Sequence, residues 1–228
     1  MIKLSEVDTR EDMLSCTRHY TLSIEEAQRA LVEHLILNNV EGDIVELGCG
    51  TGKNTHIFAD TLKKYNRSNM VYGFDTFAGY TESDMSETKD RFHPGLMEGL
   101  LDNQNSKRWN VDENIIKDKM INSGFEDTTE ITKGDVKETT KNFVPKSGKI
   151  SMLYVDCNIY GASKSGIDNL KQFFSDGCLV VTDSGFCPPP PDICGEQEAL
   201  LEYHQESKNR MYRTHFGDYI AFLVEVKK

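Results

Sequence analysis

The chain has 228 residues, enough for one sizeable hydrophobic core and short for two, so we expect a single domain over 1–228. A formal net charge of −11 and a pI near 5.0 disfavour nucleic acid as a partner, because an acidic surface repels phosphates, although a local basic groove stays open. The N-terminal residues lack the apolar run of a signal peptide, and no later segment approaches the roughly 20 apolar residues of a membrane span.

The cysteines indicate a reducing compartment. They are Cys16, Cys49, Cys157, Cys178, Cys187 and Cys194, and no two of them form the C-x-x-C pair of a zinc site. We interpret them as reduced thiols and predict a soluble, cytoplasmic protein with no membrane partner. A homo-oligomer stays open.

The first predicted elements are a helix and a strand. Residues 1–20 are polar and irregular, and Ser23 is a candidate N-cap for a helix that continues to about Asn38. We expect this helix to lie across a sheet. The apolar, β-branched composition of Asp43–Leu47 then predicts a buried strand.

Glycines follow this strand at alternate positions, in the order Glu46-x-Gly48-x-Gly50-x-Gly52. This order differs from the dinucleotide fingerprint G-x-G-x-x-G, which favours a pyrophosphate at the helix N-terminus. An acid at Glu46 would repel phosphate, whereas it suits a ligand with an ammonium group or hydroxyls, such as S-adenosylmethionine. The alternative is a tight strand-to-helix connection without a ligand.

A second strand stands at the distance expected for a ribose-binding acid. A helix over Asn54 to Tyr65 separates it from the glycine turn, and Met70–Phe74 is the strand, ending at Asp75. A carboxylate at that position can accept hydrogen bonds from both ribose hydroxyls.

Residues 80–110 lose any clear periodicity. This stretch carries acids, Met85, Met97 and the only tryptophan, Trp109. A long excursion between two core elements is typical of a lid or substrate-binding segment, which we predict here. A surface insertion without a role is the alternative.

The pattern then returns to regular elements. In chain order we expect a helix from Val111 to Ile121 ended by Ser123-Gly124, a strand Thr129–Thr132, a strand Lys149–Val155, a helix from about Ala162 to Phe174, a strand Gly177–Thr182, a stiff polyproline segment Pro188–Pro191, a helix Gly195–Ser207, and a final strand Tyr219–Val226. The final strand is expected to be antiparallel, at the sheet edge, and paired with a strand around Met211–His215.

Acids close successive strands of this predicted sheet. They are Glu46, Asp75, Asp156 and Asp183, with Asp135 just beyond a fifth strand. In an open parallel sheet ligands bind outside the carboxyl ends of the strands, so these acids should converge on one rim. The fold class that follows is α/β: a Rossmann-like, open and mostly parallel sheet with an antiparallel edge strand and helices on both faces.

The order of motifs resembles the macrocin O-methyltransferase family, S-adenosylmethionine-dependent class I enzymes that methylate sugar hydroxyls of natural products. The likeness extends from Tyr20 to Tyr219. The segments that carry it are Asp75-Thr76-Phe77-Ala78-Gly79 (family D-S-F-x-G), Gly134 to Thr139 (G-x-x-x-[DE]-T), Asp156-Cys157-Asn158-Ile159-Tyr160 (D-G-D-x-Y), Thr182-Asp183-Ser184-Gly185 (x-D-D-Y), and Gly195 with Ala199 (G-x-x-x-A).

The glycine turn and the resemblance to this family together give the predicted cofactor contacts. They are Glu46, Gly48, Gly50, Thr51, Gly52, Asp75, Thr76, Phe77, Gly134, Asp135 and Asp156, with Asp135 near the adenine. The implied substrate is a small molecule or glycan with a sugar hydroxyl.

The resemblance also implies a divalent metal, and here the chain departs from the family. The family's D-G-D and D-D acids bind Mg²⁺, but two of these positions are Asn158 and Ser184. Asp156, Asp183 and Ser184 remain as a candidate set for Mg²⁺ or Mn²⁺, weaker than in the family, and a site without metal stays open. Asp183 as a simple turn acid is the alternative.

The candidate catalytic residues are Asp156, Asn158 and His93. The family's proposed base is the second acid of D-G-D, and Asn158 cannot act as a base. The hydroxyl proton would go to a hydroxide on the metal, to Asp156 or Asp183, or to a lid histidine, of which His93 is the first to test; an ordinary loop histidine is the alternative.

Other functions stay open at this point. A catechol-type O-methyltransferase and a non-catalytic S-adenosylmethionine-binding protein both fit the first motifs. A nicotinamide oxidoreductase would need G-x-G-x-x-G and a catalytic Tyr/Lys or His, which we do not find at suitable spacing.

Overall fold

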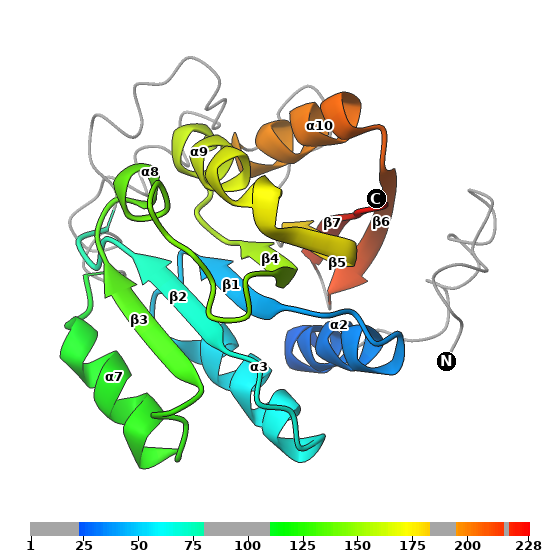
Figure 1. Cartoon of the computed structure of the whole chain (residues 1–228). Helices are drawn as coiled ribbons and strands as arrows, with labels where there is room; N and C mark the ends of the chain where they lie inside the picture. The colour runs from blue at the N-terminus through cyan, green and yellow to red at the C-terminus, as the bar shows by residue number, and fades with distance from the viewer. Residues whose placement is uncertain (1–22, 80–109, 183–194, 217–218) are drawn as a thin grey trace.

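The computed structural model describes residues 23–79, 110–182, 195–216 and 219–228 (Figure 1). The predicted lid over 80–110 lies outside these ranges apart from its last residue, and so do His93, Asp183, Ser184 and the polyproline segment.

A seven-stranded sheet forms the centre of the molecule, with the strand order β3-β2-β1-β4-β5-β7-β6. The strands are β1 (Asp43–Leu47), β2 (Val71–Asp75), β3 (Thr129–Lys133), β4 (Ile150–Val155), β5 (Phe174–Thr182), β6 (Arg210–Phe216) and β7 (Tyr219–Glu225). The first five run parallel, and β7 pairs antiparallel with both β5 and β6. The predicted fold class and the pairing of the last two strands are confirmed. The prediction that the final strand is the edge was wrong: β7 lies inside the sheet and β6 takes the edge.

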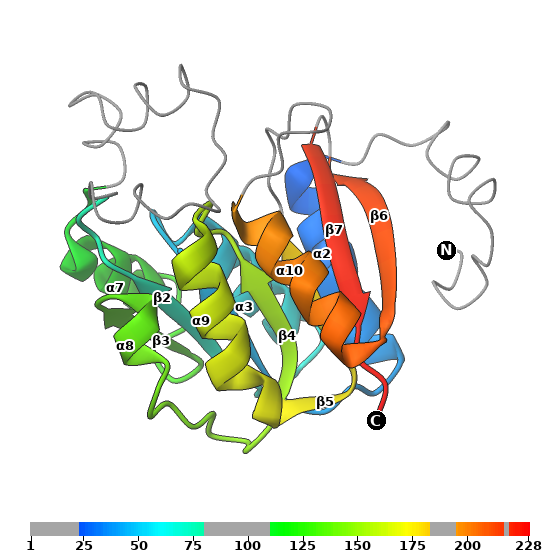
Figure 2. The ribbon, with the colours of Figure 1, turned by 90° about the horizontal axis from the view of Figure 1, so that it is seen from above.

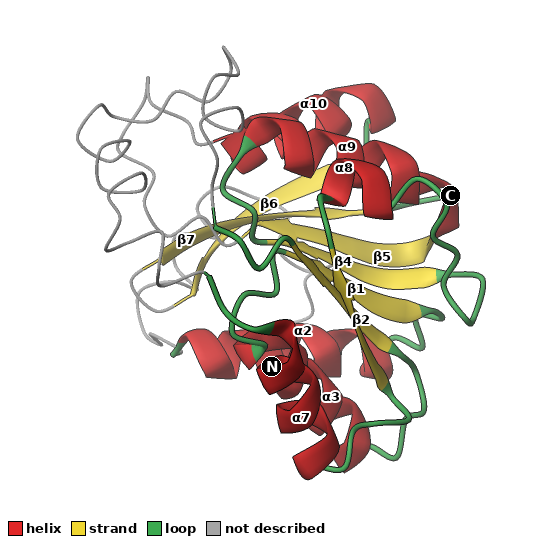
Figure 3. Ribbon diagram, turned by 90° about the vertical axis from the view of Figure 1, so that its left-hand side faces the viewer, coloured by secondary structure: helices red, strands yellow, loops and turns green. Residues whose placement is uncertain are grey.

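Helices cover both faces of the sheet (Figures 2 and 3). One face carries α2 (Ile24–Leu37), α3 (Lys53–Lys64) and α7 (Glu113–Asn122), and the other carries α8 (Val136–Thr139), α9 (Tyr160–Leu170) and α10 (Gly195–Ser207). None of the helices in the described ranges has the length and apolar character needed to cross a membrane.

Helix α2 begins where the sequence predicts. The Ser23 side chain accepts a hydrogen bond from the Glu26 N–H, and the Glu26 carboxylate accepts one from the Ser23 N–H. This capping box satisfies two backbone donors that the first helical turn leaves unpaired. The buried side of the helix then packs on the sheet through Leu31, Val32 and Leu35.

Three elements differ from the expectation: one helix was not predicted, and a helix and a strand have other bounds. Helix α8 was not expected, because its four residues are too few to show a period. Helix α9 starts at Tyr160 and gives way to a 3-10 turn over Lys171–Phe173, so the expected single helix ends early. Strand β5 starts at Phe174, which pairs with Ile150 before a register shift; the intervening polar and glycine residues concealed this first part of the strand.

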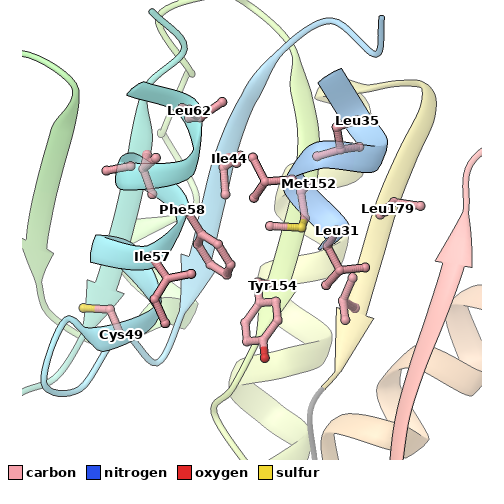
Figure 4. Close-up of a cluster of buried hydrophobic side chains, with 14 of the residues drawn as sticks. Leu31, Leu35, Ile44, Cys49, Ile57, Phe58, Leu62, Met152, Tyr154 and Leu179 are labelled. Carbon is pink, nitrogen blue, oxygen red and sulfur yellow. The ribbon is translucent and has the colours of Figure 1, made fainter. Parts of the chain in front are cut away.

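Two apolar clusters fill the space between the sheet and its two helical layers. Figure 4 shows the one under α2 and α3, in which Ile44 and Met152 of adjacent strands meet Phe58 and Leu31. The opposite cluster joins Val45, Leu153 and Val180 to α9 and α10. Neighbouring residues of a strand therefore face different layers, as expected for a sheet buried on both sides.

The topology creates a crevice between β1 and β4. After β1 the chain turns to α3 on one face, and after β4 it turns to α9 on the other. The ends of the two strands stay joined by a hydrogen bond from the Asp156 N–H to the Leu47 carbonyl, 2.8 Å long. Diverging connections at adjacent parallel strands mark the usual ligand-binding position in such folds.

Candidate functional site

A cavity opens at this crevice, over the carboxyl ends of β1, β2, β3 and β4. Its empty space, counted with the open mouth, is about 650 Å³. Its lining comprises Gly48, Gly50, Asp75, Thr76, Gly79, Asp135, Val136, Asp156, Cys157, Asn158, Ile159 and Ala162. Predicted site residues from four separate loops are thus brought together in one place.

The three glycines of the first turn serve different contacts. Gly48 has φ +86°, and a Cβ there would lie 2.2 Å from the Asp156 carbonyl oxygen. Gly50 has φ +46° and donates its N–H to the Asp75 carboxylate over 2.8 Å. A Cβ on Gly52 would lie 2.5 Å from Cγ2 of Ile116 in α7. Gly48 and Gly50 form part of the cavity wall, whereas Gly52 packs against a helix.

Five of the predicted cofactor contacts do not line the cavity: Glu46, Thr51, Gly52, Phe77 and Gly134. Thr51 is exposed, and its carbonyl accepts a hydrogen bond from Lys119. Glu46 is fully buried and accepts a hydrogen bond from the Thr55 hydroxyl of α3. Direct contact of either residue, or of Gly52, with a cofactor stays a prediction.

Asp75 is held at the end of β2 by backbone donors. Its Oδ2 accepts the Gly50 N–H at 2.8 Å, and its Oδ1 accepts the Phe77 N–H at 2.7 Å. Burial raises the pKa of the Asp75 carboxyl above its ordinary value, although the two N–H donors act in the opposite direction. The carboxylate is therefore preorganised in the cavity wall while retaining acceptor positions for a ligand.

The residues after Asp75 divide between cavity and core. The Thr76 hydroxyl accepts the Ala78 N–H over 3.2 Å, and Thr76 and Gly79 line the cavity. Phe77 adopts a left-handed backbone, φ +53°, and is buried in the apolar cluster next to α3. Phe77 therefore supports the turn from the core side; its predicted cofactor contact stays a prediction.

The third loop combines Gly134 and Asp135. The Gly134 N–H donates to the Asp75 carbonyl at 2.8 Å, so the ends of β2 and β3 are tied together. The Asp135 side chain caps α8 by accepting the Lys137 N–H at 2.8 Å, and it also lines the cavity. The short helix missed from sequence thus fixes a predicted site residue.

The segment Asp156–Asn158 supplies the cavity wall after β4. Oδ2 of Asp156 accepts a hydrogen bond of 3.2 Å from Nδ2 of Asn54. Asn158 has a left-handed backbone, φ +61°, and donates its N–H to Oε2 of Glu196 at 2.8 Å. Burial raises the pKa of the Cys157 thiol well above its ordinary value, with the Glu196 and Asp156 carboxylates adding to the effect. Cys157 is accordingly a neutral wall residue.

Several contributing residues were not predicted. Asn54 lies in the first turn of α3, immediately after the glycines, and this position could have identified it. Glu196 is fully buried at the start of α10, inside the segment Gly195 to Ala199 that was noted only for its likeness to the family's G-x-x-x-A helix start. Val136, Ile159 and Ala162 supply the apolar part of the wall; only their position after predicted acids could have marked them.

Two of the three proposed metal ligands and the proposed lid base fall in segments that the structure does not describe. Asp183, Ser184 and His93 lie outside the described ranges. Within those ranges, no three His, Cys, Asp or Glu side chains are grouped to hold a metal ion.

Comparison with known proteins agrees with this geometry. Residues 45–185 match the family model described as "Methyltransferase domain". The structure of the O-methyltransferase NovP is similar to the chain with a TM-score of 0.71 at 23% identity, covering 90% of this chain and 79% of that one. A structure of the calicheamicin methyltransferase CalS11 gives a TM-score of 0.66 at 20% identity, covering 95% of this chain and 80% of that one.

A second CalS11 structure, described as a TDP-rhamnose 3'-O-methyltransferase, gives 0.60 at 20% identity, covering 95% of this chain and 81% of that one. These likenesses establish the class I methyltransferase fold. No curated protein sequence matches the chain. The family match covers more than half of the residues, including the glycine turn and the loops after β2, β3 and β4, and on that ground the chain belongs to the methyltransferase domain family and is a methyltransferase.

Proposed function

We propose that this protein is an S-adenosylmethionine-dependent O-methyltransferase that acts on a sugar hydroxyl of a glycan, glycoside or natural product. The observation that supports it most is the set of carboxylates Asp75, Asp135 and Asp156 around one cavity with a glycine wall. Such a site favours a cationic, hydroxyl-bearing cofactor.

The residues of the cavity fit the methyl donor. S-adenosylmethionine supplies a methyl group on a positively charged sulfur. We infer that Asp75 accepts hydrogen bonds from the ribose and that Asp156 pairs with the ammonium group. Val136, Ile159 and Ala162, which line the same cavity, would offer an apolar surface to the adenine ring. Asp135 would lie at the adenine end.

The proposed acceptor rests on the solved relatives and on charge. CalS11 is described as an enzyme that methylates TDP-rhamnose, and an acidic chain suits a neutral or weakly charged small molecule better than nucleic acid. A catechol-type acceptor is the second candidate, because the same wall of acids and apolar residues would accept an aromatic diol.

Proton removal is the chemical step that the chain's residues must support, since an alcohol is a poor nucleophile until its proton leaves. The Asn158 amide cannot accept that proton but can orient the hydroxyl by hydrogen bonding. We propose Asp156, Asp183 or His93 as the proton acceptor.

The test is binding followed by turnover. We expect S-adenosylhomocysteine, and not NAD, to bind the protein in calorimetry and to raise its melting temperature. With labelled S-adenosylmethionine, a panel of nucleotide sugars and glycosides should give methylated products, and catechols should not. Binding without product in all panels would favour a non-catalytic binding protein, and absence of binding would contradict the proposal outright.

A divalent ion at Asp156, Asp183 and Ser184 is a separate proposal, motivated by the family pattern. Asp156 is the one member within the described ranges, and its carboxylate lies in the cavity wall where a Mg²⁺ or Mn²⁺ ion would face the substrate. We expect EDTA to lower the methyl-transfer rate at least tenfold and Mg²⁺ or Mn²⁺ to restore it. Full activity in chelator would assign activation to a side-chain base.

A further inference from the structure

A chain of two side-chain amides, the buried Gln28 and the partly buried Asn54, leads from helix α2 to the cavity. Nε2 of Gln28 donates to Oδ1 of Asn54 over 2.9 Å and to the Tyr154 hydroxyl over 3.1 Å. Nδ2 of Asn54 then donates to Oδ2 of Asp156 over 3.2 Å. Three segments that are far apart in sequence, α2, α3 and the end of β4, thus meet at one carboxylate.

The donor on Gln28 fixes the orientation of the Asn54 amide. An asparagine side chain presents an acceptor on one side and two donors on the other. Because Oδ1 of Asn54 is occupied by Gln28, its NH₂ group faces Asp156. Turning that amide over would place an oxygen against the carboxylate and an NH₂ group against the NH₂ of Gln28, so the two hydrogen bonds hold each other in place.

Fold stability alone does not account for a glutamine at position 28. Gln28 is fully buried, and its Oε1 has no hydrogen-bond partner in the part of the chain that the structure describes. A buried polar atom without a partner destabilises a protein, whereas an apolar side chain of similar shape avoids that penalty. A glutamine at this position is explained if its NH₂ group is needed to donate to Asn54.

We propose that Gln28 and Asn54 are positioning residues for Asp156. Resting on the function proposed above, this assignment holds that Asn54 fixes the rotamer of the Asp156 carboxylate in the cavity wall and that Gln28 acts through Asn54. The carboxylate is then presented to the ligand in one orientation, which spares the ordering cost when the cofactor binds. Neither residue lines the cavity.

Calorimetric binding of S-adenosylhomocysteine to the full chain tests this assignment. Asn54→Leu keeps the shape and removes the donor, and it should weaken binding about tenfold, the usual effect of losing one hydrogen bond to a charged group. Gln28→Met should weaken binding about threefold. The double variant should match Asn54→Leu rather than show the product of the two effects, because both act along one path.

A matched control separates positioning from a structural role. Asn69 is also partly buried and donates its side-chain NH₂ to the Gly42 carbonyl over 2.7 Å, at the opposite end of the sheet. Asn69→Leu should lower the free energy of unfolding and leave binding unchanged. Gln28→Met should weaken binding and leave the free energy of unfolding nearly unchanged.

The outcomes distinguish the two proposals. If wild-type protein does not bind S-adenosylhomocysteine, the proposed function fails. If wild type binds and the folded Asn54→Leu and Gln28→Met variants bind equally well, the positioning role alone is overturned. Should Asn54→Leu not fold, Gln28→Met decides the question, since an apolar residue there removes a buried unpaired atom.

Discussion

Gly48→Ala should abolish S-adenosylhomocysteine binding and lower the free energy of unfolding by about 3 kcal/mol or more. Two costs combine at this position. The backbone has φ +86°, which side-chain-bearing residues rarely adopt, and the added Cβ would lie 2.2 Å from the Asp156 carbonyl oxygen. Since that oxygen belongs to the backbone, either the glycine turn or the end of β4 must move, and both are walls of the cavity. Denaturant unfolding and calorimetry measure the two effects.

Gly148→Ala is the matched control. Gly148 also has a left-handed backbone, φ +71°, but a Cβ there would meet no heavy atom within 4 Å. We expect a loss of about 1 kcal/mol, from backbone conformation alone, and unchanged binding. If the two alanine variants unfold at the same denaturant concentration, the contact of the added Cβ with the Asp156 carbonyl does not destabilise the fold, and this prediction is wrong.

Local pattern was enough to predict most of the elements and the place of the cavity. Largely apolar stretches such as Met70–Phe74 and Lys149–Val155 identified buried parallel strands, because both faces of such a sheet are covered. Acids at strand ends then had to share a rim, and Asp75, Asp135 and Asp156 do line one cavity. The strand direction alone brings them together, so no knowledge of packing was required.

What the sequence could not reveal depends on contacts between distant segments. Gln28 and Asn54 are 26 residues apart, Asn158 and Glu196 are 38 apart, and Asn54 and Asp156 are 102 apart. Each pair becomes visible only after the helices have packed on the sheet. The direction of the Glu46 side chain is a similar case: the strand was predicted, but its contact with Thr55 depends on how α3 lies across it. The order of β6 and β7 is another, since either could have paired with β5.

Asp75→Asn should weaken S-adenosylhomocysteine binding between about tenfold and a hundredfold, the effect of roughly 1.5–3 kcal/mol for hydrogen bonds to a charged group. Asparagine keeps the shape but offers one acceptor where Asp75 offers two. One of the N–H donors of Gly50 and Phe77 would then face an NH₂ group, and the turn that carries Thr76 and Gly79 would lose its anchor. Asp43→Asn is the control, because Asp43 likewise accepts two backbone N–H groups, from Met70 and Ser147, at the other end of the sheet. It should destabilise the fold without changing affinity.

The raised pKa of the Asp75 carboxyl adds a pH signature to the same experiment. A carboxyl whose pKa is higher in the folded protein than in the unfolded chain holds its proton more tightly when folded. Protonation of Asp75 therefore increases the stability of the fold as pH falls through the raised pKa. This contribution is absent at neutral pH. Ligand hydroxyls need the ionised form as acceptor, so affinity should fall over that same acidic range, beginning above pH 3.8. Asp75→Asn, which has no proton to take up, should bind weakly with a flatter pH profile. An identical pH profile in wild type and Asp75→Asn would remove Asp75 from the cofactor site, and the ribose contact would have to be sought elsewhere in the cavity wall.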